Sequence, residues 1–250
     1  MNFLKNLFQS STDVKTADLS LVGADMHSHL LPGIDDGSPD METTVFLLQK
    51  LASLGYKKAI TTPHVMFDLY RNTPEIIKEA EEKVKEEIAK NQINIEFEAA
   101  AEYLIDEGFE SLLATDKLIT FGDNYLLVEL PYSSEPRELG QIIFNLQIKG
   151  YKVILAHPER YSYWHHTYDK YENLKEAGVF FQLNINSITR FHSSGTRKVA
   201  SWLIKQRMVD FLGTDLHNKA YLSVLEKATK NPMLIDLLNS GKLKNRELLG

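Results

Sequence analysis

The sequence predicts an α/β fold built on parallel strands, either a closed barrel or an open, doubly wound sheet. Short apolar runs rich in β-branched residues alternate about seven times with longer amphipathic segments, a pattern typical of parallel strands joined by helical crossovers. The chain has 250 residues and is 43% hydrophobic, which suits one barrel of roughly 250 residues. We therefore expect a single domain over residues 1–250.

The predicted elements follow the chain in order. Seven segments are expected to be strands: 24–29, 57–64, 95–103, 124–131, 151–160, 179–184 and 208–217. Ser38 as N-cap and Pro39 in the first turn predict a helix that stops at Gly55, and Thr73-Pro74 precede a charged helix that runs to residue 90. Further helices are expected near 137–149, 168–177, 194–206 and 220–229, and a final helix with a polar tail at 231–250.

Composition excludes several classes of protein. The net charge is -6, so no broad basic field exists to hold nucleic acid. Without cysteine the chain has no disulfide framework, and any metal would have nitrogen and oxygen ligands; this also favours a reducing cytoplasm. No apolar run approaches the roughly 20 residues of a membrane span. We expect residues 1–20 to form a tail or a strap across the barrel, with a membrane-surface contact as the alternative.

Each predicted strand ends in a residue type that can bind a metal ion. These strand-end residues are His27, His29, His64, Glu102, Glu129, His157, Asn184, Asp215 and His217. The stretch ADMHSHLLPGIDDG adds Asp35 and Asp36 in a loop bracketed by glycines. The C-terminal ends of parallel strands open onto one face, so residues far apart in sequence converge there.

The convergence predicts divalent metal ions. Five imidazoles and four carboxylates on one face without cations would be costly in desolvation and in repulsion. Mixed imidazole and carboxylate ligands suit Mn, Fe or Zn, and bridging carboxylates suit a cluster of two or three ions.

Other polar and aromatic residues are interpreted as structural. His165, His166 and His192 lie in predicted loops and are taken as surface residues. The aromatic run that follows HPER is expected to pack over a helix, with a place at the mouth of the site as the alternative. Its members are Tyr161, Tyr163, Trp164 and Tyr168.

Seven ordered motifs give a more specific signal. DMHSHLLPGIDDG, TPH, AEYLID, VELP, HPERY, QLN and GTDLHN resemble the PHP (polymerase and histidinol phosphatase) superfamily, most closely its bacterial tyrosine-protein phosphatase branch of capsule and exopolysaccharide loci. The resemblance runs from about residue 22 to about residue 230. It implies the PHP fold, a distorted, TIM-barrel-like barrel of about seven β/α units.

The resemblance also implies a trinuclear site with Mn²⁺ as the expected metal. The first ion would be held by His27, His29, Glu102 and Asp215, and the second by Glu102, Glu129 and His157. The third would be held by Asp36, His64 and His217, with Asp35 as the alternative to Asp36. Arg160 corresponds to the phosphate-binding arginine of the family, and its planar fork suits bidentate contact with phosphoryl oxygens.

The implied activity is phosphotyrosine hydrolysis by a hydroxide that bridges two ions, acting on a bacterial tyrosine kinase of polysaccharide synthesis. Alternatives are a small-molecule phosphatase such as a histidinol phosphatase or a nucleotide phosphoesterase, a non-catalytic metal-binding regulatory module, and a barrel amidohydrolase. Whether Arg190 reaches the substrate stays open, and the loop 66–73 is taken as solvent-exposed, with a place at the entrance as the alternative.

Overall fold

The computed structural model describes residues 15–115 and 118–250, so most of the predicted N-terminal strap lies outside the described residues. All strand pairs are parallel. The strands are β1 Ala24–Asp25, β2 Lys58–Thr61, β3 His64–Val65, β4 Glu96–Ala99, β5 Glu102–Leu104, β6 Tyr125–Glu129, β7 Lys152–Ala156, β8 Phe180–Asn184 and β9 Phe211–Gly213. They form two sheets, in the orders β1-β2-β4 and β3-β5-β6-β7-β8-β9.

The two sheets curl into one distorted barrel of seven strand positions, which confirms the predicted barrel. Two of the predicted strands are interrupted. The predicted strand 57–64 is split into β2 and β3, and the predicted strand 95–103 is split into β4 and β5. Pro63 lies at the first break, where its missing N–H cannot extend the ladder. The barrel closes where a parallel bridge joins Ser28 to Leu216, beyond the ends of β1 and β9.

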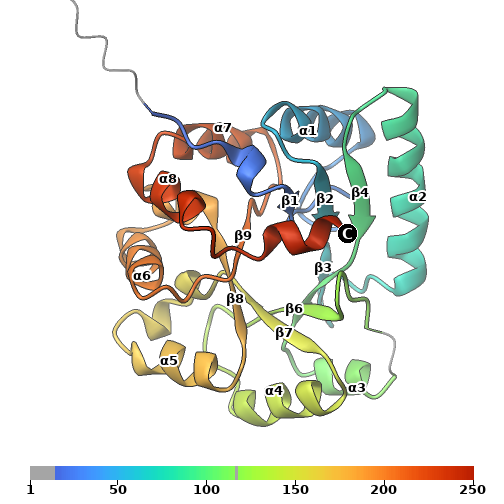
Figure 1. Cartoon of the computed structure of the whole chain (residues 1–250). Coiled ribbons are helices and arrows are strands. Elements are labelled where there is room, and N and C mark those ends of the chain that lie inside the picture. The colour runs from blue at the N-terminus through green and yellow to red at the C-terminus, as the bar shows by residue number, and fades with distance from the viewer. Residues whose placement is uncertain (1–14, 116–117) are drawn as a thin grey trace, which may run out of the picture.

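Helices surround the barrel on the outside (Figure 1). They are α1 Met41–Ser53, α2 Pro74–Lys90, α3 Phe109–Leu113, α4 Leu139–Ile148, α5 Asp169–Glu176, α6 Ser194–Lys205, α7 Lys219–Ala228 and α8 Pro232–Asn239. The predicted cap of α1 is wrong, because Asp40 rather than Ser38 accepts the first-turn N–H, from Thr43. The Ser38 hydroxyl is buried and donates to the carbonyl of Asp40 instead.

The C-terminal segment closes the N-terminal end of the barrel, so the predicted polar tail is wrong. Figure 1 shows this segment crossing the front of the barrel. Residues Asn245–Leu249 form a 3₁₀ helix. The buried Asn245 side chain accepts from the N–H of Leu212 and donates to the carbonyls of Leu212 and Ala24. Leu248 fills the interior beneath them.

The interior of the barrel changes from apolar to polar along the strands. Strand periodicity directs alternate residues inward. On β6 the inward positions are Tyr125 and Leu127, both in the interior apolar cluster, and then Glu129. On β8 the corresponding positions include Gln182 and Asn184, both buried. The polar residues therefore lie at the C-terminal end of the barrel.

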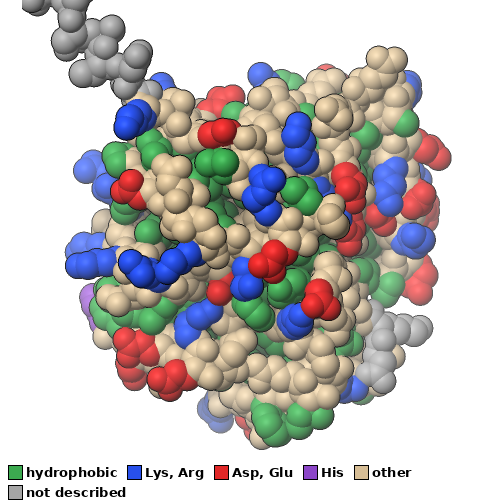
Figure 2. Space-filling view, viewed as in Figure 1, with side chains coloured by type: hydrophobic (Ala, Val, Ile, Leu, Met, Phe, Trp, Pro, Cys, Tyr) green, Lys and Arg blue, Asp and Glu red, His purple; other side chains and the backbone are tan. Residues whose placement is uncertain are grey.

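The opposite face carries mixed charge. Figure 2 shows Lys and Arg intermixed with Asp and Glu on the N-terminal end of the barrel, as the absence of a broad basic field predicts. Among the helices of the described residues, none combines the length and apolar character that crossing a bilayer requires.

Candidate metal centre

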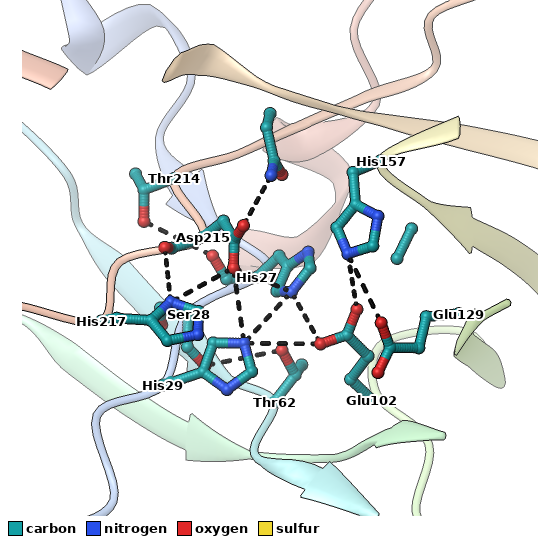
Figure 3. A network of polar contacts seen from close by, with 12 residues as sticks. His27, Ser28, His29, Thr62, Glu102, Glu129, His157, Thr214, Asp215 and His217 are labelled. Atoms are coloured by element: carbon teal, nitrogen blue, oxygen red, sulfur yellow. Dashed lines mark hydrogen bonds and ion pairs between the residues drawn. The ribbon is translucent and has the colours of Figure 1, made fainter. Parts of the chain in front are cut away.

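The nine predicted metal ligands meet at the C-terminal end of the barrel. Their ligand atoms form four overlapping groups in which all atoms lie within 4.8 Å of one another. The groups are His29, Asp36, His64 and His217; His27, His29 and Asp215; His27, Glu102 and His157; and His64, Glu102 and Glu129. Figure 3 shows most of these side chains turned toward a common centre.

The two histidines after β1 are oriented by their Nδ1 atoms. His27 Nδ1 donates to Gln182 Oε1 at 2.8 Å, and His29 Nδ1 lies 2.8 Å from Asp35 Oδ2. Each Nε2 therefore turns inward, and the two Nε2 atoms lie 3.3 Å apart. Glu102 Oε2 lies 3.1 Å from one and 3.4 Å from the other. Histidine metal ligands are commonly held by this kind of second hydrogen bond.

Unpaired buried atoms also fit a metal ion. His64 Nδ1 and Glu129 Oε1 lie 3.0 Å apart, yet neither has a hydrogen bond of acceptable geometry. Buried polar groups are normally paired, so such atoms call for a ligand. Divalent cations that accept imidazole nitrogen and carboxylate oxygen as ligands would satisfy these atoms.

The geometry distinguishes the two adjacent aspartates. Asp35 is fully engaged, because its carboxylate also accepts from the backbone N–H groups of Gly37 and His64. The Asp36 side chain is 55% exposed, and its Oδ1 lies 3.5 Å from His64 Nε2 and 3.7 Å from His217 Nε2. Asp35 thus orients a histidine, and Asp36 has the free oxygen that a ligand needs.

A chain of amides positions Asp215. Its Oδ2 accepts from Asn184 Nδ2 at 2.6 Å, Asn184 Oδ1 accepts from Gln182 Nε2, and Gln182 Oε1 accepts from His27. Sequence reasoning noted Asn184 as a strand-end residue but missed Gln182. The signal was present in QLN, because residues two apart on a strand face the same side.

Two predicted ligands lie outside regular strand geometry. The sequence prediction placed Asp215 and His217 on one strand, but β9 ends at Gly213 and Asp215 has a φ of 51°. His157 likewise follows the end of β7 with a φ of 33°. These left-handed conformations turn the side chains into the centre, and such strain is typically found at functional sites.

Electrostatic effects inside the centre oppose one another. Burial and the charge of Glu102 both raise the pKa of Glu129. Burial disfavours ionisation of Glu102 as well, but His27 and His64 hold its pKa well below the usual value. Burial lowers the pKa of His157 to about 4, with Arg160 adding to the effect. A neutral imidazole beside two buried carboxylates is a suitable donor set for a divalent ion.

Arg160 lies at the rim of this centre. Its Nη1 donates to Asp215 Oδ2 at 3.0 Å, and its side chain is 22% exposed. The guanidinium carbon lies 4.9 Å from the centroid of the Tyr132 ring. The other N–H groups of the guanidinium donate no hydrogen bond to a described residue.

Three tyrosines stack on the outer histidines of the centre. The ring of Tyr70 stacks on His64, that of Tyr132 on His157 and that of Tyr221 on His217, with centroid separations of 5.8, 5.9 and 4.9 Å. Tyr132 is 46% exposed. Sequence reasoning considered Tyr70 in an entrance loop and missed the other two.

The residues interpreted as structural have mixed outcomes. Tyr161 and Trp164 are buried, and Trp164 packs on Tyr171 of α5, as predicted for the aromatic run. His166 is exposed. The surface interpretation is wrong for His192, whose Nε2 is buried without a hydrogen-bond partner and whose pKa is lowered to about 4 by burial and by Arg160.

A centre of this kind on the C-terminal face of a parallel barrel is the arrangement of a metal-dependent hydrolase. The family model for capsular polysaccharide synthesis proteins, CpsB/CapC, matches residues 23–227. The chain therefore belongs to the CpsB/CapC family.

Individual relatives agree with this assignment. The tyrosine-protein phosphatase YwqE of Bacillus subtilis is 28% identical over 195 residues, which cover 78% of this chain and 77% of YwqE. The tyrosine-protein phosphatase CpsB of Streptococcus pneumoniae is 25% identical over 203 residues, which cover 78% of this chain and 82% of CpsB.

Solved structures extend the comparison. One matching structure comes from a study of YwqE and S. pneumoniae CpsB, which that study describes as unique metal-dependent tyrosine phosphatases. The match has a TM-score of 0.76 and 27% identity, and it covers 90% of this chain and 94% of that chain. An amidohydrolase from Mycoplasma synoviae shares the fold, with a TM-score of 0.55 and 11% identity over 94% of this chain and 92% of that chain.

Proposed function

We propose that this chain is a metal-dependent protein-tyrosine phosphatase that uses two or three divalent ions, with Mn²⁺ as the native metal. The convergence of nine imidazole and carboxylate ligands beside a partly exposed arginine carries the proposal. The family and the named activity of its relatives support it.

Within this proposal the predicted ligand sets are retained. The first ion is held by His27, His29, Glu102 and Asp215, the second by Glu102, Glu129 and His157, and the third by Asp36, His64 and His217. Bound there, the ions would supply Lewis acidity and an activated water, which is the chemistry that a cysteine-free phosphatase needs.

The remaining residues bind and orient the phosphotyrosine. Arg160 has free N–H donors at the rim, where they can hold phosphoryl oxygens and offset the charge that develops on them. Asp215 fixes the orientation of this guanidinium. The exposed ring of Tyr132 offers a surface for the aromatic side chain. The tyrosinate leaving group has a pKa of about 10, so it departs with less need of a strong acid than an alkoxide does.

We further propose a protein substrate in the cytoplasm, a bacterial tyrosine kinase of polysaccharide synthesis. The description of the CpsB/CapC family as one of capsular polysaccharide synthesis supports this assignment.

The test is phosphate release from a phosphotyrosine peptide, a phosphoserine peptide and histidinol phosphate, with Mn²⁺-loaded enzyme and a chelated control. Metal-dependent turnover confined largely to phosphotyrosine is expected. Turnover of histidinol phosphate alone would move the function to small-molecule metabolism. Metal binding without turnover of any ester would favour a regulatory module.

Arg160→Ala provides a separate check on the rim residue. The substitution should raise KM for the phosphotyrosine peptide and lower kcat, because the guanidinium contacts the phosphoryl group both in the ground state and in the transition state. Unchanged values of both constants would remove Arg160 from the site.

A further inference from the structure

Three cationic side chains, Arg190, Arg197 and Lys198, gather at one edge of the molecule. On α6, four polar residues at i, i+3, i+4 and i+7 share one face: Ser194, Arg197, Lys198 and Ser201. The buried face of the helix is formed by other residues. These four residues and Arg190 line a surface pocket of about 430 Å³.

In the described part of the chain, the cations of this pocket have no acidic partner. Within residues 15–115 and 118–250, no carboxylate oxygen lies within 4.0 Å of the charged nitrogens of Arg190, Arg197 or Lys198. By contrast, Lys83 and Lys85 on α2 each pair with a glutamate of the same helix at 2.7 Å. Neighbouring like charges without a counter-charge repel one another, and here they do so in a chain whose net charge is -6. An external anion would relieve that repulsion.

Packing contacts connect the pocket to the metal centre. Arg190 directly precedes Phe191, whose ring packs on Tyr221 at a centroid distance of 4.9 Å. Tyr221 in turn stacks on His217, also at 4.9 Å. Helix α6 also packs against the 3₁₀ helix Pro158–Arg160, which carries the rim arginine. Two ring contacts therefore connect the residue after Arg190 to His217 of the metal centre, and α6 contacts the segment that carries Arg160.

We propose that this pocket binds an anionic side chain of the protein substrate, either a carboxylate or a second phosphate, near the phosphotyrosine that enters the metal centre. The proposal rests on the proposed phosphatase function and adds a preference for acidic sequence. The path from His217 to Phe191 consists of two ring-centroid distances of 4.9 Å, and the side chain of Arg190 extends beyond it. An extended peptide advances about 3.3 Å per residue. We therefore expect the anionic residue to lie three to five positions from the phosphotyrosine.

The experiment compares kcat/KM for matched phosphotyrosine peptides with the wild-type enzyme loaded with Mn²⁺. One peptide carries glutamates three to five residues from the phosphotyrosine on both sides, a second carries glutamines there, and a third carries phosphoserines. We expect the wild type to prefer the glutamate peptide over the glutamine peptide about tenfold, because two or three exposed charge pairs combine. The preference should shrink in roughly 0.5 M salt, where the Debye length is only a few ångströms.

The variant Arg190→Gln/Arg197→Gln/Lys198→Gln should reduce this preference to about one. Lys242→Gln is the matched control, because it removes an exposed positive charge near the C-terminal segment and should leave the preference intact. The ratio between the phosphoserine and glutamate peptides identifies which anion the pocket takes.

Two outcomes would overturn the inference. Either the wild type hydrolyses all three peptides equally well, or its preference persists in the triple variant. Both outcomes leave the proposed phosphatase function standing, since turnover of the glutamine peptide tests that function separately. If no phosphotyrosine peptide is hydrolysed, the proposed function fails first and the inference fails with it.

Discussion

The two ends of the barrel bury polar side chains for different purposes. At the N-terminal end, Asn245 makes three hydrogen bonds to the backbone of β1 and β9, so its amide is fully used. At the C-terminal end, His64 Nδ1 and Glu129 Oε1 are buried without such partners. The first arrangement stabilises the closed barrel. The second retains unsatisfied groups that only a ligand can satisfy.

Glu102→Gln should have the largest effect, because Glu102 contacts His27, His29, His64 and His157. The substitution removes the charge that is proposed to link two ions. Phosphotyrosine hydrolysis should fall on the order of 10³-fold or more. The measurement is kcat/KM together with metal content by mass spectrometry. Retention of full activity would show that Glu102 is not a bridging ligand.

Gln182→Ala should weaken metal binding at the same end of the barrel, with a smaller effect than that of Glu102→Gln. Its amide orients His27 and, through Asn184, Asp215. Loss of such an orienting partner typically costs 10- to 100-fold in metal affinity. Titration with Mn²⁺ measures this affinity. If it is unchanged, the amide chain serves packing alone.

Asn245→Ala should distinguish the two ends of the barrel, because it lowers the stability of the fold and leaves the metal centre unchanged. The change leaves backbone groups of Ala24 and Leu212 buried without partners, at a cost of about 2–3 kcal/mol in the free energy of unfolding. Urea denaturation measures that loss. Metal content and kcat of the folded protein should stay near wild type, and a selective loss of metal would contradict the separation of roles.

Tyr221→Leu should give the smallest effect. Its ring stacks on His217 and packs on Phe191, so its removal loosens one wall of the mouth. Aromatic pairs contribute about 0.5–1.5 kcal/mol, which corresponds to a few-fold rise in KM for a phosphotyrosine peptide. An unchanged KM would limit Tyr221 to a packing role.

Sequence reasoning predicted the barrel and nominated every histidine, aspartate and glutamate of the four metal-capable groups at its C-terminal end. It succeeded because all of these residues except the loop residue Asp36 lie at the end of a predicted apolar strand, and parallel strands end on one face. It failed where a role depends on contacts distant in sequence. Gln182, Tyr132 and His192 are examples.

Two further errors have different origins. Asn245 was assigned to a polar tail because its partners on β1 and β9 lie far away in the sequence. Ser38 was taken as a helix cap because Ser-Pro precedes the helix, but Asp40 is nearer to the first free N–H and accepts it. Local sequence patterns predict the helices and strands, but they do not show which polar side chain accepts a given N–H group.

The most direct test of the central claim is a crystal structure of the Mn²⁺-soaked protein with anomalous diffraction. The account predicts anomalous peaks among the three ligand sets, with Glu102 shared by two of them and Asp36, not Asp35, at the third. An absence of peaks within this cluster, with the side chains in the same positions, would contradict the account.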